Sequence, residues 1–221
     1  MRFLEQCPAC GGTDLAFSYE FRDHGRDRIW PVWSCRSCGL GFVNPQPEWD
    51  ELSPYYGEDY APYAPDHAAP DDEAGLIEQA RRTGRLRFAP VTPGARVLDV
   101  GCGGGWFLTM ARRLGALVQG VEPSLVAARR ARERFDVITC NHVLEHVPDP
   151  VDTLAAMARL LDEGGQAVIS VPNAECWAAR GLRGAWHSTD LPRHLMQFGP
   201  DSLERAAARA GLRTESMATY S

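Results

Sequence analysis

Short apolar runs alternate with segments of helical periodicity from about residue 91 to the end of the chain. Runs of apolar, often β-branched residues predict buried strands, whereas apolar positions that recur every three or four residues predict amphipathic helices. The predicted strands are 95–100, 116–121, 135–140 and 166–171, and the predicted helices are 106–114, 151–161 and 201–210. Strands that alternate with helices are typical of parallel sheets. We therefore expect an α/β, Rossmann-like domain with a doubly wound, mostly parallel sheet.

The beginning of the chain has a different pattern. Apolar and polar positions alternate around 15–21 and 29–33, which predicts a short hairpin. A linker follows, with four tyrosines that either pack the small module against the next domain or form one wall of a substrate pocket. Helical periodicity resumes from Glu73 to Phe88. We divide the chain into a small module at 1–45, an aromatic linker and leading helix at 46–90, and the α/β domain at 91–221.

Four of the seven cysteines form two Cys-x-x-Cys-Gly turns that flank the predicted hairpin. In such a turn both sulfurs can face one point, and the glycine supplies the backbone freedom that the turn needs. Four thiolates close a tetrahedral Zn²⁺ site, so we expect a structural zinc ribbon that is stabilised by its metal. The predicted ligands are Cys7, Cys10, Cys35 and Cys38. The alternative, a redox-active Cys-x-x-Cys, predicts one pair beside a strand and a helix.

Composition narrows the classes of function. The chain has 221 residues and a net charge of −6, and its 23 basic residues are all arginines. The absence of lysine excludes Schiff-base, pyridoxal-phosphate and P-loop lysine chemistry. The negative charge makes nucleic acid an unfavoured partner. Because neither a signal peptide nor a membrane-spanning run is found, we expect a cytoplasmic protein with no membrane partner, and the oligomeric state stays open.

A glycine-rich loop follows the first strand of the α/β domain. Asp99 lies two residues before Gly101, and glycines recur at every second position up to Gly105. A strand, a glycine loop and a helix begin a Rossmann-type unit, and Glu122 ends the second strand, where an acid binds ribose hydroxyls. A carboxylate beside the loop would repel a pyrophosphate but attract a sulfonium and an ammonium. This favours S-adenosylmethionine over NAD or FAD.

The sequence VLDVGCGGG, with the acid downstream, resembles the cofactor-binding motif of class I S-adenosylmethionine-dependent methyltransferases. The later FDVITCNHVLEHVPDP is similar to the fourth-strand region of the branch that includes ubiquinone-biosynthesis O-methyltransferases. The ribbon, the NPQP and tyrosine segment and LPRHL resemble bacterial members of that branch with an N-terminal zinc ribbon. The resemblance implies methyl transfer on a doubly wound sheet, with cofactor contacts at Asp99, Gly101, Cys102, Gly103, Glu122, Asn141 and His142.

Two places depart from the family pattern. Only 12 residues separate Glu122 from Phe135, and one crossover helix would use nearly all of them. The third strand then has no room, and the adenine-contacting acid that normally follows it cannot be assigned. The chain also stops about ten residues after the helix that ends at Ala210. Either the chain lacks an edge strand or a segment is missing between Glu122 and Phe135. We favour the second, and we expect the natural protein to be longer.

His142, Glu145 and His146 follow the strand 135–140, at the edge where open α/β sheets bind ligands. Their order also matches an inverted zinc-peptidase motif, but Pro148 and Pro150 interrupt the helix that such a motif needs. Glu145 and His146 either have helix-capping and packing roles or hold a divalent metal.

A long insertion, Ala174 to Phe198, separates the last predicted strand from the last predicted helix. Segments of this length between a strand and a helix are commonly binding lids. Histidine suits proton removal near neutral pH, so His194 and His187 are the candidate catalytic residues, with surface or structural roles as the alternative. The other cysteines, Cys102, Cys140 and Cys176, are interpreted as small buried hydrophobes.

Together these patterns predict an enzyme that transfers a methyl group from S-adenosylmethionine to an oxygen or carbon of a small-molecule acceptor, such as a sugar, a quinol or another biosynthetic intermediate. One alternative is a non-catalytic zinc-ribbon and Rossmann binding module, which the missing third strand would suit. Another is a ribosomal RNA methyltransferase, although the acidic balance argues against it. The acceptor and the methylated atom stay open.

Overall fold

The computed structural model describes residues 1–23, 25–56, 74–75, 77–78, 88–122, 134–182 and 186–219. The chain forms two compact units. The first, which we call the ribbon unit, contains Met1–Tyr56, Leu144–Ala155 and Val171–Ser221. The second, the sheet unit, contains Gly57–Val143 and Ala156–Ser170. Each unit therefore gathers segments that are far apart in the sequence.

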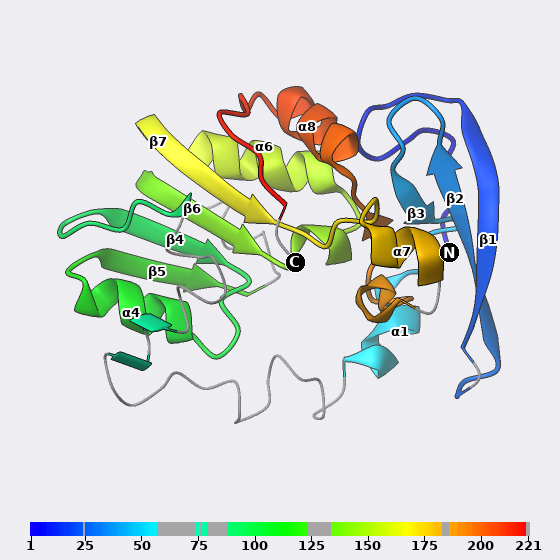
Figure 1. Cartoon of the computed structure of the whole chain (residues 1–221), viewed down its shortest axis with the longest axis horizontal. Helices are drawn as coiled ribbons and strands as arrows, with labels where there is room; N and C mark the ends of the chain where they lie inside the picture. Colours follow the sequence, from blue (N-terminus) through cyan, green and yellow to red (C-terminus); the bar gives the residue numbers. More distant parts are fainter. Residues whose placement is uncertain are drawn as a thin grey trace. The chain divides into compact units, whose positions relative to one another are not determined.

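The sheet unit contains four parallel strands in the order β5-β4-β6-β7 (Figure 1). They are β4 (Arg96–Val100), β5 (Leu117–Val121), β6 (Phe135–Asn141) and β7 (Leu161–Ser170). Helix α4 (Trp106–Arg113) connects β4 to β5, and its Phe107 and Met110 are buried in one cluster with Val97 and Val137 of the sheet. The expected α/β fold with a Rossmann-like parallel sheet is confirmed.

Some predicted boundaries differ from the structure. Strand β7 begins at Leu161, five residues before the predicted start at Gln166, because Leu161 pairs with Phe135 ahead of a register shift. The sequence leaves no room for a third strand between Glu122 and Phe135. Among the described strands, β5 lies at one edge of the sheet, next to β4. The crossover helix predicted between Glu122 and Phe135 lies outside the described residues, as does most of the leading helix predicted at 73–88.

The ribbon unit contains an antiparallel sheet whose first two strands are the predicted hairpin (Figure 1). The sheet order is β1 (Leu15–Asp23), β2 (Arg28–Cys35), β3 (Gly41–Val43) and β8 (Met196–Gln197). Strand β8 belongs to the insertion, so a segment far along the chain completes the sheet of the ribbon. Trp30, Val32, Val43 and Leu191 form a buried cluster on this sheet, and Tyr55 packs against it.

Short helices complete the ribbon unit. They are α1 (Trp49–Leu52), η1 (Ser53–Tyr55), η4 (Leu144–His146), α7 (Trp177–Leu182), η6 (His187–Thr189) and α8 (Pro200–Arg209). Helix α6 (Pro150–Leu160) contributes residues to both units. Within the described part of the chain, no helix combines the length and the apolar character that crossing a bilayer requires.

Candidate functional site

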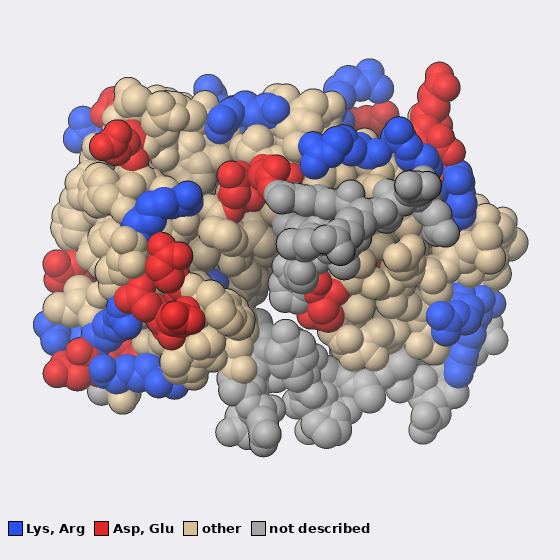
Figure 2. Space-filling model, turned by 180° about the vertical axis from the view of Figure 1, so that it is seen from behind, with Lys and Arg blue, Asp and Glu red and all other residues tan. Residues whose placement is uncertain are grey.

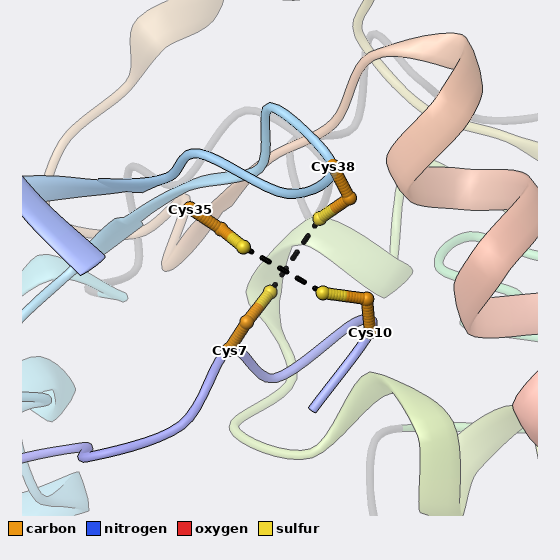
Figure 3. Close-up of side chains that lie close together, drawn as sticks. All are labelled: Cys7, Cys10, Cys35 and Cys38. Atoms are coloured by element: carbon orange, nitrogen blue, oxygen red, sulfur yellow. Dashed lines mark hydrogen bonds between the residues drawn. The ribbon is translucent and has the colours of Figure 1, made fainter. Parts of the chain in front are cut away.

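Four cysteine side chains from two loops of the ribbon unit point toward one another (Figure 3). The Sγ atoms of Cys7 and Cys38 are 3.6 Å apart, as are those of Cys10 and Cys35. Zn–S bonds of about 2.3 Å in a tetrahedron would place the sulfurs about 3.8 Å apart. The four predicted ligands are therefore brought together at distances that fit a zinc ion.

Equivalent backbone hydrogen bonds hold each of the two Cys-x-x-Cys turns. The Gly11 amide donates to the Cys7 carbonyl at 2.9 Å, and the Gly39 amide donates to the Cys35 carbonyl at 2.8 Å. Both glycines have a φ of 75°, a left-handed conformation that residues with a Cβ rarely adopt. The glycine after each cysteine pair is thus required by the turn.

The chemistry of these donors favours a soft cation. Burial raises the pKa of the Cys7 thiol to about 11 and also raises the pKa of Cys38. Metal ligation requires thiolates, so a bound cation would displace these protons. Four sulfur ligands suit Zn²⁺ and leave no open coordination position.

In the sheet unit, the loop between β4 and α4 requires glycine at position 101. Gly101 has a φ of 73°, and a Cβ there would lie 2.1 Å from Cγ2 of Val143. Its amide donates to the Val121 carbonyl at 2.7 Å, and Gly105, with a φ of 74°, is the N-cap of α4. The loop is thus fixed at the carboxyl ends of the parallel strands, the edge where open α/β sheets bind ligands.

Two carboxylates border this loop. Asp99 is fully buried, at 0% exposure, and the Thr139 hydroxyl donates to its Oδ1 at 2.6 Å. Glu122 is exposed just after β5, and its carboxylate accepts a hydrogen bond from the Gly103 amide. Ionised carboxylates accept hydrogen bonds from ammonium and hydroxyl groups, so this edge suits a ligand that carries both.

The other residues expected to bind cofactor lie in the same unit. Asn141 ends β6, and the exposed His142 follows it with a φ of 54°. Cys102 is half-buried in the loop, where burial, with the charges of Glu122 and Asp99, raises its pKa to about 11. Its thiol is therefore neutral at neutral pH.

A second group of titratable side chains lies in the ribbon unit. Glu145 and His146 of η4 meet His194 of the insertion, and one ligand atom from each lies within 4.8 Å of the others. The rings of His146 and His194 are edge to face, with centroids 4.6 Å apart. A carboxylate and two imidazoles in this arrangement can move a proton or hold a divalent cation.

Backbone carbonyls orient both imidazoles of this group. Nδ1 of His194 donates to the Ser188 carbonyl at 2.8 Å, and Nδ1 of His146 donates to the Arg193 carbonyl at 3.1 Å. A carbonyl oxygen only accepts, so Nδ1 carries the hydrogen in each ring. Nε2 of each neutral ring then keeps its lone pair.

The surroundings of the two histidines differ. Burial lowers the pKa of His146 to about 4, so this ring is neutral at neutral pH. Nε2 of His194 lies 3.9 Å from Oε1 of Glu145 and 3.8 Å from Oδ2 of Asp190. Nε2 of His194 therefore faces two carboxylates.

Some of the sequence predictions can be compared with the described residues. His194 is brought into this group with 9% exposure, whereas the side chain of His187 lies outside the described residues. Of the linker tyrosines, Tyr55 packs on Trp30, with ring centroids 6.1 Å apart, and the Tyr56 hydroxyl lies 3.2 Å from Nδ1 of His146. Tyr60 and Tyr63 lie outside the described residues.

Sequence reasoning missed two residues of these sites. Thr139 lies opposite Asp99 in the β4–β6 pair, so aligning the two predicted strands in parallel would have found it. Asp190 belongs to no motif, and its spacing of four from His194 was the available signal. Cys140 is buried as predicted, whereas Cys102 and Cys176 are only partly buried.

Comparisons with known proteins find a matching family model and several sequence relatives. The family model of a methyltransferase domain matches residues 74–217. An ubiquinone biosynthesis O-methyltransferase from Thiobacillus denitrificans is 34% identical over 168 residues, which cover 60% of this chain and 72% of the relative. One from Alkalilimnicola ehrlichii is 33% identical over 155 residues, which cover 56% and 63%.

A solved S-adenosylmethionine-dependent methyltransferase from Mesorhizobium loti is similar at 17% identity with a TM-score of 0.47, over 62% of this chain and 82% of that one. The chain spans about two thirds of the length of the two sequence relatives.

Proposed function

This chain belongs to the class I S-adenosylmethionine-dependent methyltransferases, and we propose that it transfers the methyl group of S-adenosylmethionine to an oxygen or carbon of a small-molecule acceptor. The observation that carries this proposal is the glycine loop between β4 and α4, with the buried carboxylate of Asp99 beside it. The names of the relatives, which are O-methyltransferases, favour oxygen as the methylated atom.

The cofactor contacts follow from charge and position. A buried carboxylate attracts a cationic ligand more strongly than an exposed one, because the local dielectric is lower, so Asp99 binds the positively charged end of the donor. The exposed Glu122 binds the ribose hydroxyls, and the loop around Gly101 and Gly103 lets the ligand approach the backbone. Cys102, Asn141 and His142 complete the proposed contacts.

Methyl transfer is a displacement at a carbon that the sulfonium already activates. The S–CH₃ bond breaks, its electrons stay on sulfur, and the acceptor oxygen forms the new O–CH₃ bond. The protein therefore aligns the acceptor, excludes water and removes one proton. We assign that proton to Nε2 of His194, which lies 3.9 Å from Oε1 of Glu145 and 3.8 Å from Oδ2 of Asp190. His187 remains the second candidate for this role.

The proposed role of zinc is structural. Four sulfur ligands leave no position for substrate or water, so the ion would stabilise the ribbon without taking part in the reaction. Nη1 of Arg209, in α8, donates to the Ala9 carbonyl at 2.9 Å, within the first cysteine turn. A bound zinc would therefore also support the position of α8 in the ribbon unit.

RNA is the less favoured acceptor. On the face shown in Figure 2, acidic side chains lie among the arginines of the described residues. Proteins that follow a nucleic acid backbone instead gather basic residues on one face or along a stripe. A net charge of −6 and the small-molecule pathway in the names of the relatives both favour a small acceptor.

Incubation with S-adenosylmethionine that carries a deuterated methyl group, together with a metabolite extract, tests the proposed activity. We expect mass spectrometry to find a labelled product with the parent protein and at least about a hundredfold less with His194→Gln, since a general base contributes at least that factor. S-adenosylhomocysteine binding should be unchanged in this variant. The absence of any labelled product contradicts the activity, and full activity of His194→Gln contradicts the assignment of the base.

A further inference from the structure

Strand β1 lies at an edge of the antiparallel sheet in the ribbon unit. The sheet order is β1-β2-β3-β8, so β1 pairs with β2 and with no other described strand (Figure 1). Its nine residues exceed the about five or six residues of an average strand. In an edge strand, every second residue turns its N–H and C=O groups away from the sheet. The outer side of β1 is therefore a surface on which a further strand can form hydrogen bonds.

A bulge limits the part of β1 that can pair regularly. The pairing with β2 skips Ser18, because Phe17 and Tyr19 are opposite successive residues of β2. An extra residue of this kind interrupts a ladder and bends the strand. From Tyr19–Asp23 the register with β2 is regular, and the turn of the hairpin follows. The segment that can pair regularly with another strand is thus centred on Phe21.

The two charged residues inside this segment share one face of the sheet. Phe21 pairs with Trp30, which is fully buried, so the Phe21 side chain is on the inner face. Glu20 and Arg22 are therefore on the outer face, and both are exposed. Nη1 of Arg22 lies 3.6 Å from Oδ1 of Asp27, but the Asp27 side chain is 95% exposed, so solvent screens this pair. A guanidinium has several N–H donors, so Arg22 can also pair with a second carboxylate.

These two charges are self-complementary in one antiparallel register. Two copies of β1 that are related by a two-fold axis pair symmetrically around the residue on the axis. With Phe21 on the axis, Glu20 of each copy is opposite Arg22 of the other, and opposite charges in such positions stabilise a sheet. The same register uses the whole regular segment, because Phe21 is at its centre.

The neighbouring registers are disfavoured by the same charges. With Glu20 on the axis, two carboxylates would be opposite each other, and with Arg22 on the axis, two guanidinium groups would be. Charged residues commonly keep the edges of sheets from pairing with other strands. On β1 their order opposes two symmetric registers and supports the third. A second copy of this chain is therefore an occupant whose charges match those of the edge.

We propose that β1 is the interface of a homodimer, in which two copies pair in antiparallel orientation around Phe21. Their four-stranded sheets then join into one continuous sheet. A standard protein interface buries about 1,200–2,000 Å², and pairing over so short a segment buries less. The dimer is consequently weak and forms at about micromolar concentrations. The proposal goes beyond methyl transfer and does not depend on it.

Sedimentation equilibrium of the full chain at about 1–300 μM tests the inference. We expect the parent protein to pass from monomer to dimer in this range. Glu20→Arg and Arg22→Glu each place like charges opposite each other twice in the dimer, so each should weaken dimerisation about tenfold or more. The double variant Glu20→Arg/Arg22→Glu should restore the affinity of the parent, because the same register again pairs opposite charges.

Arg213→Glu and Glu215→Arg are the matched controls. These two residues form an exposed pair with the same spacing, outside β1, and their side chains are 86% and 59% exposed. The control variants change the net charge by the same amounts as the variants of β1, so dimerisation should be unchanged in both. Melting temperatures of all variants, measured at concentrations where the protein is monomeric, should be close to that of the parent, because the substituted positions are exposed.

Hydrogen exchange locates the contact. The amides of Tyr19–Asp23 should exchange more slowly at concentrations that favour the dimer. Protection that is the same at every concentration would mean that another part of the chain covers the edge, and it would overturn the inference. A parent that stays monomeric, a dimer that neither single charge reversal weakens, or a double variant no stronger than the single ones would overturn it as well. None of these outcomes affects the binding of S-adenosylhomocysteine, which tests the proposed function separately.

Discussion

At the scale of single residues, the proposed donor site depends on a buried carboxylate held by a neighbouring strand. Asp99 and Thr139 occupy paired positions in β4 and β6, and the hydroxyl donates to the carboxylate at 2.6 Å. A hydrogen bond to a charged group contributes about 1.5–3 kcal/mol. The same bond fixes the orientation of the carboxylate, on which the binding of a cationic ligand would depend.

We expect Thr139→Val to weaken S-adenosylhomocysteine binding about tenfold, because Oδ1 of Asp99 loses its donor while the side chain keeps its volume. Thr153→Val is the control, since Thr153 is equally buried but its hydroxyl donates to the Asp149 carbonyl. Titration calorimetry measures both. Equal affinities of Thr139→Val and the parent would remove the role given to Asp99.

The glycine loop allows a second residue-scale test. Gly101 and Gly94 both have positive φ, 73° and 82°, but a Cβ at Gly94 meets nothing within 4 Å, whereas one at Gly101 meets Val143 at 2.1 Å. Gly94→Ala should cost about 1 kcal/mol from backbone strain alone. We expect Gly101→Ala to lower the melting temperature further and to abolish S-adenosylhomocysteine binding. Identical behaviour of the two variants would contradict the close packing of the loop.

At the scale of elements, the sequence predicts those that have a strong local pattern. Strands β4 and β6 were predicted because strands buried on both faces appear as continuous apolar runs. Strand β5 was predicted as well, although its Leu117 is exposed. The start of β7 was missed because Gly164 and Gly165 are typical of a turn. Strand β8 has two residues and exists through its pairing with β3, which no local pattern encodes.

One arginine of β4 pairs with acidic residues of two other strands of the sheet unit, β6 and β7. The Arg96 guanidinium lies 2.8 Å from the carboxylate of Asp136 and 2.6 Å from that of Asp162. Its hydrogen bonds hold the pKa of both carboxyls below their usual range. Because the folded pKa is the lower one, this stabilisation is present above about pH 4 and is lost as the pH falls through the folded pKa.

We expect Arg96→Gln to lower the melting temperature by a few degrees at pH 7, because the side chains of this group are 40–45% exposed and solvent screens them. The difference from the parent should shrink as the pH falls below 4. Arg112→Gln, at an exposed position of α4, is the control. Thermal unfolding at several pH values measures the effect, and a difference that stays constant down to pH 2 would exclude the carboxylates as its source.

At the scale of the whole molecule, the ribbon is part of a larger unit. Strand β8 pairs with β3, and Arg209 of α8 donates to the Ala9 carbonyl. The spacing of the cysteines predicted that their four side chains would meet, because a Cys-x-x-Cys turn is local. The meeting of His194 with Glu145 could not be predicted, because it depends on how the insertion packs on the ribbon.

Removal of one metal ligand tests how far the ribbon stabilises this unit. We expect Cys35→Ser to lose most of its zinc to a chelator that leaves the parent loaded, and to unfold at a lower temperature, since zinc contributes about 10–16 kcal/mol in small zinc peptides. Cys176→Ser is the matched control, because Cys176 does not belong to the four-cysteine cluster. Its Sγ accepts a hydrogen bond from the Ala179 amide. Metal analysis and calorimetry measure the outcome. Full zinc content with unchanged unfolding would contradict the structural role.

The most direct measurement is calorimetric titration of the full chain with S-adenosylhomocysteine and, separately, with NAD. S-adenosylhomocysteine carries an ammonium and no phosphate, so the carboxylate of Asp99 should attract it, and we expect micromolar binding at one site per chain. The pyrophosphate of NAD should be repelled by the same carboxylate. Binding of NAD without binding of S-adenosylhomocysteine would contradict the assignment of this chain as a methyl-transferring enzyme.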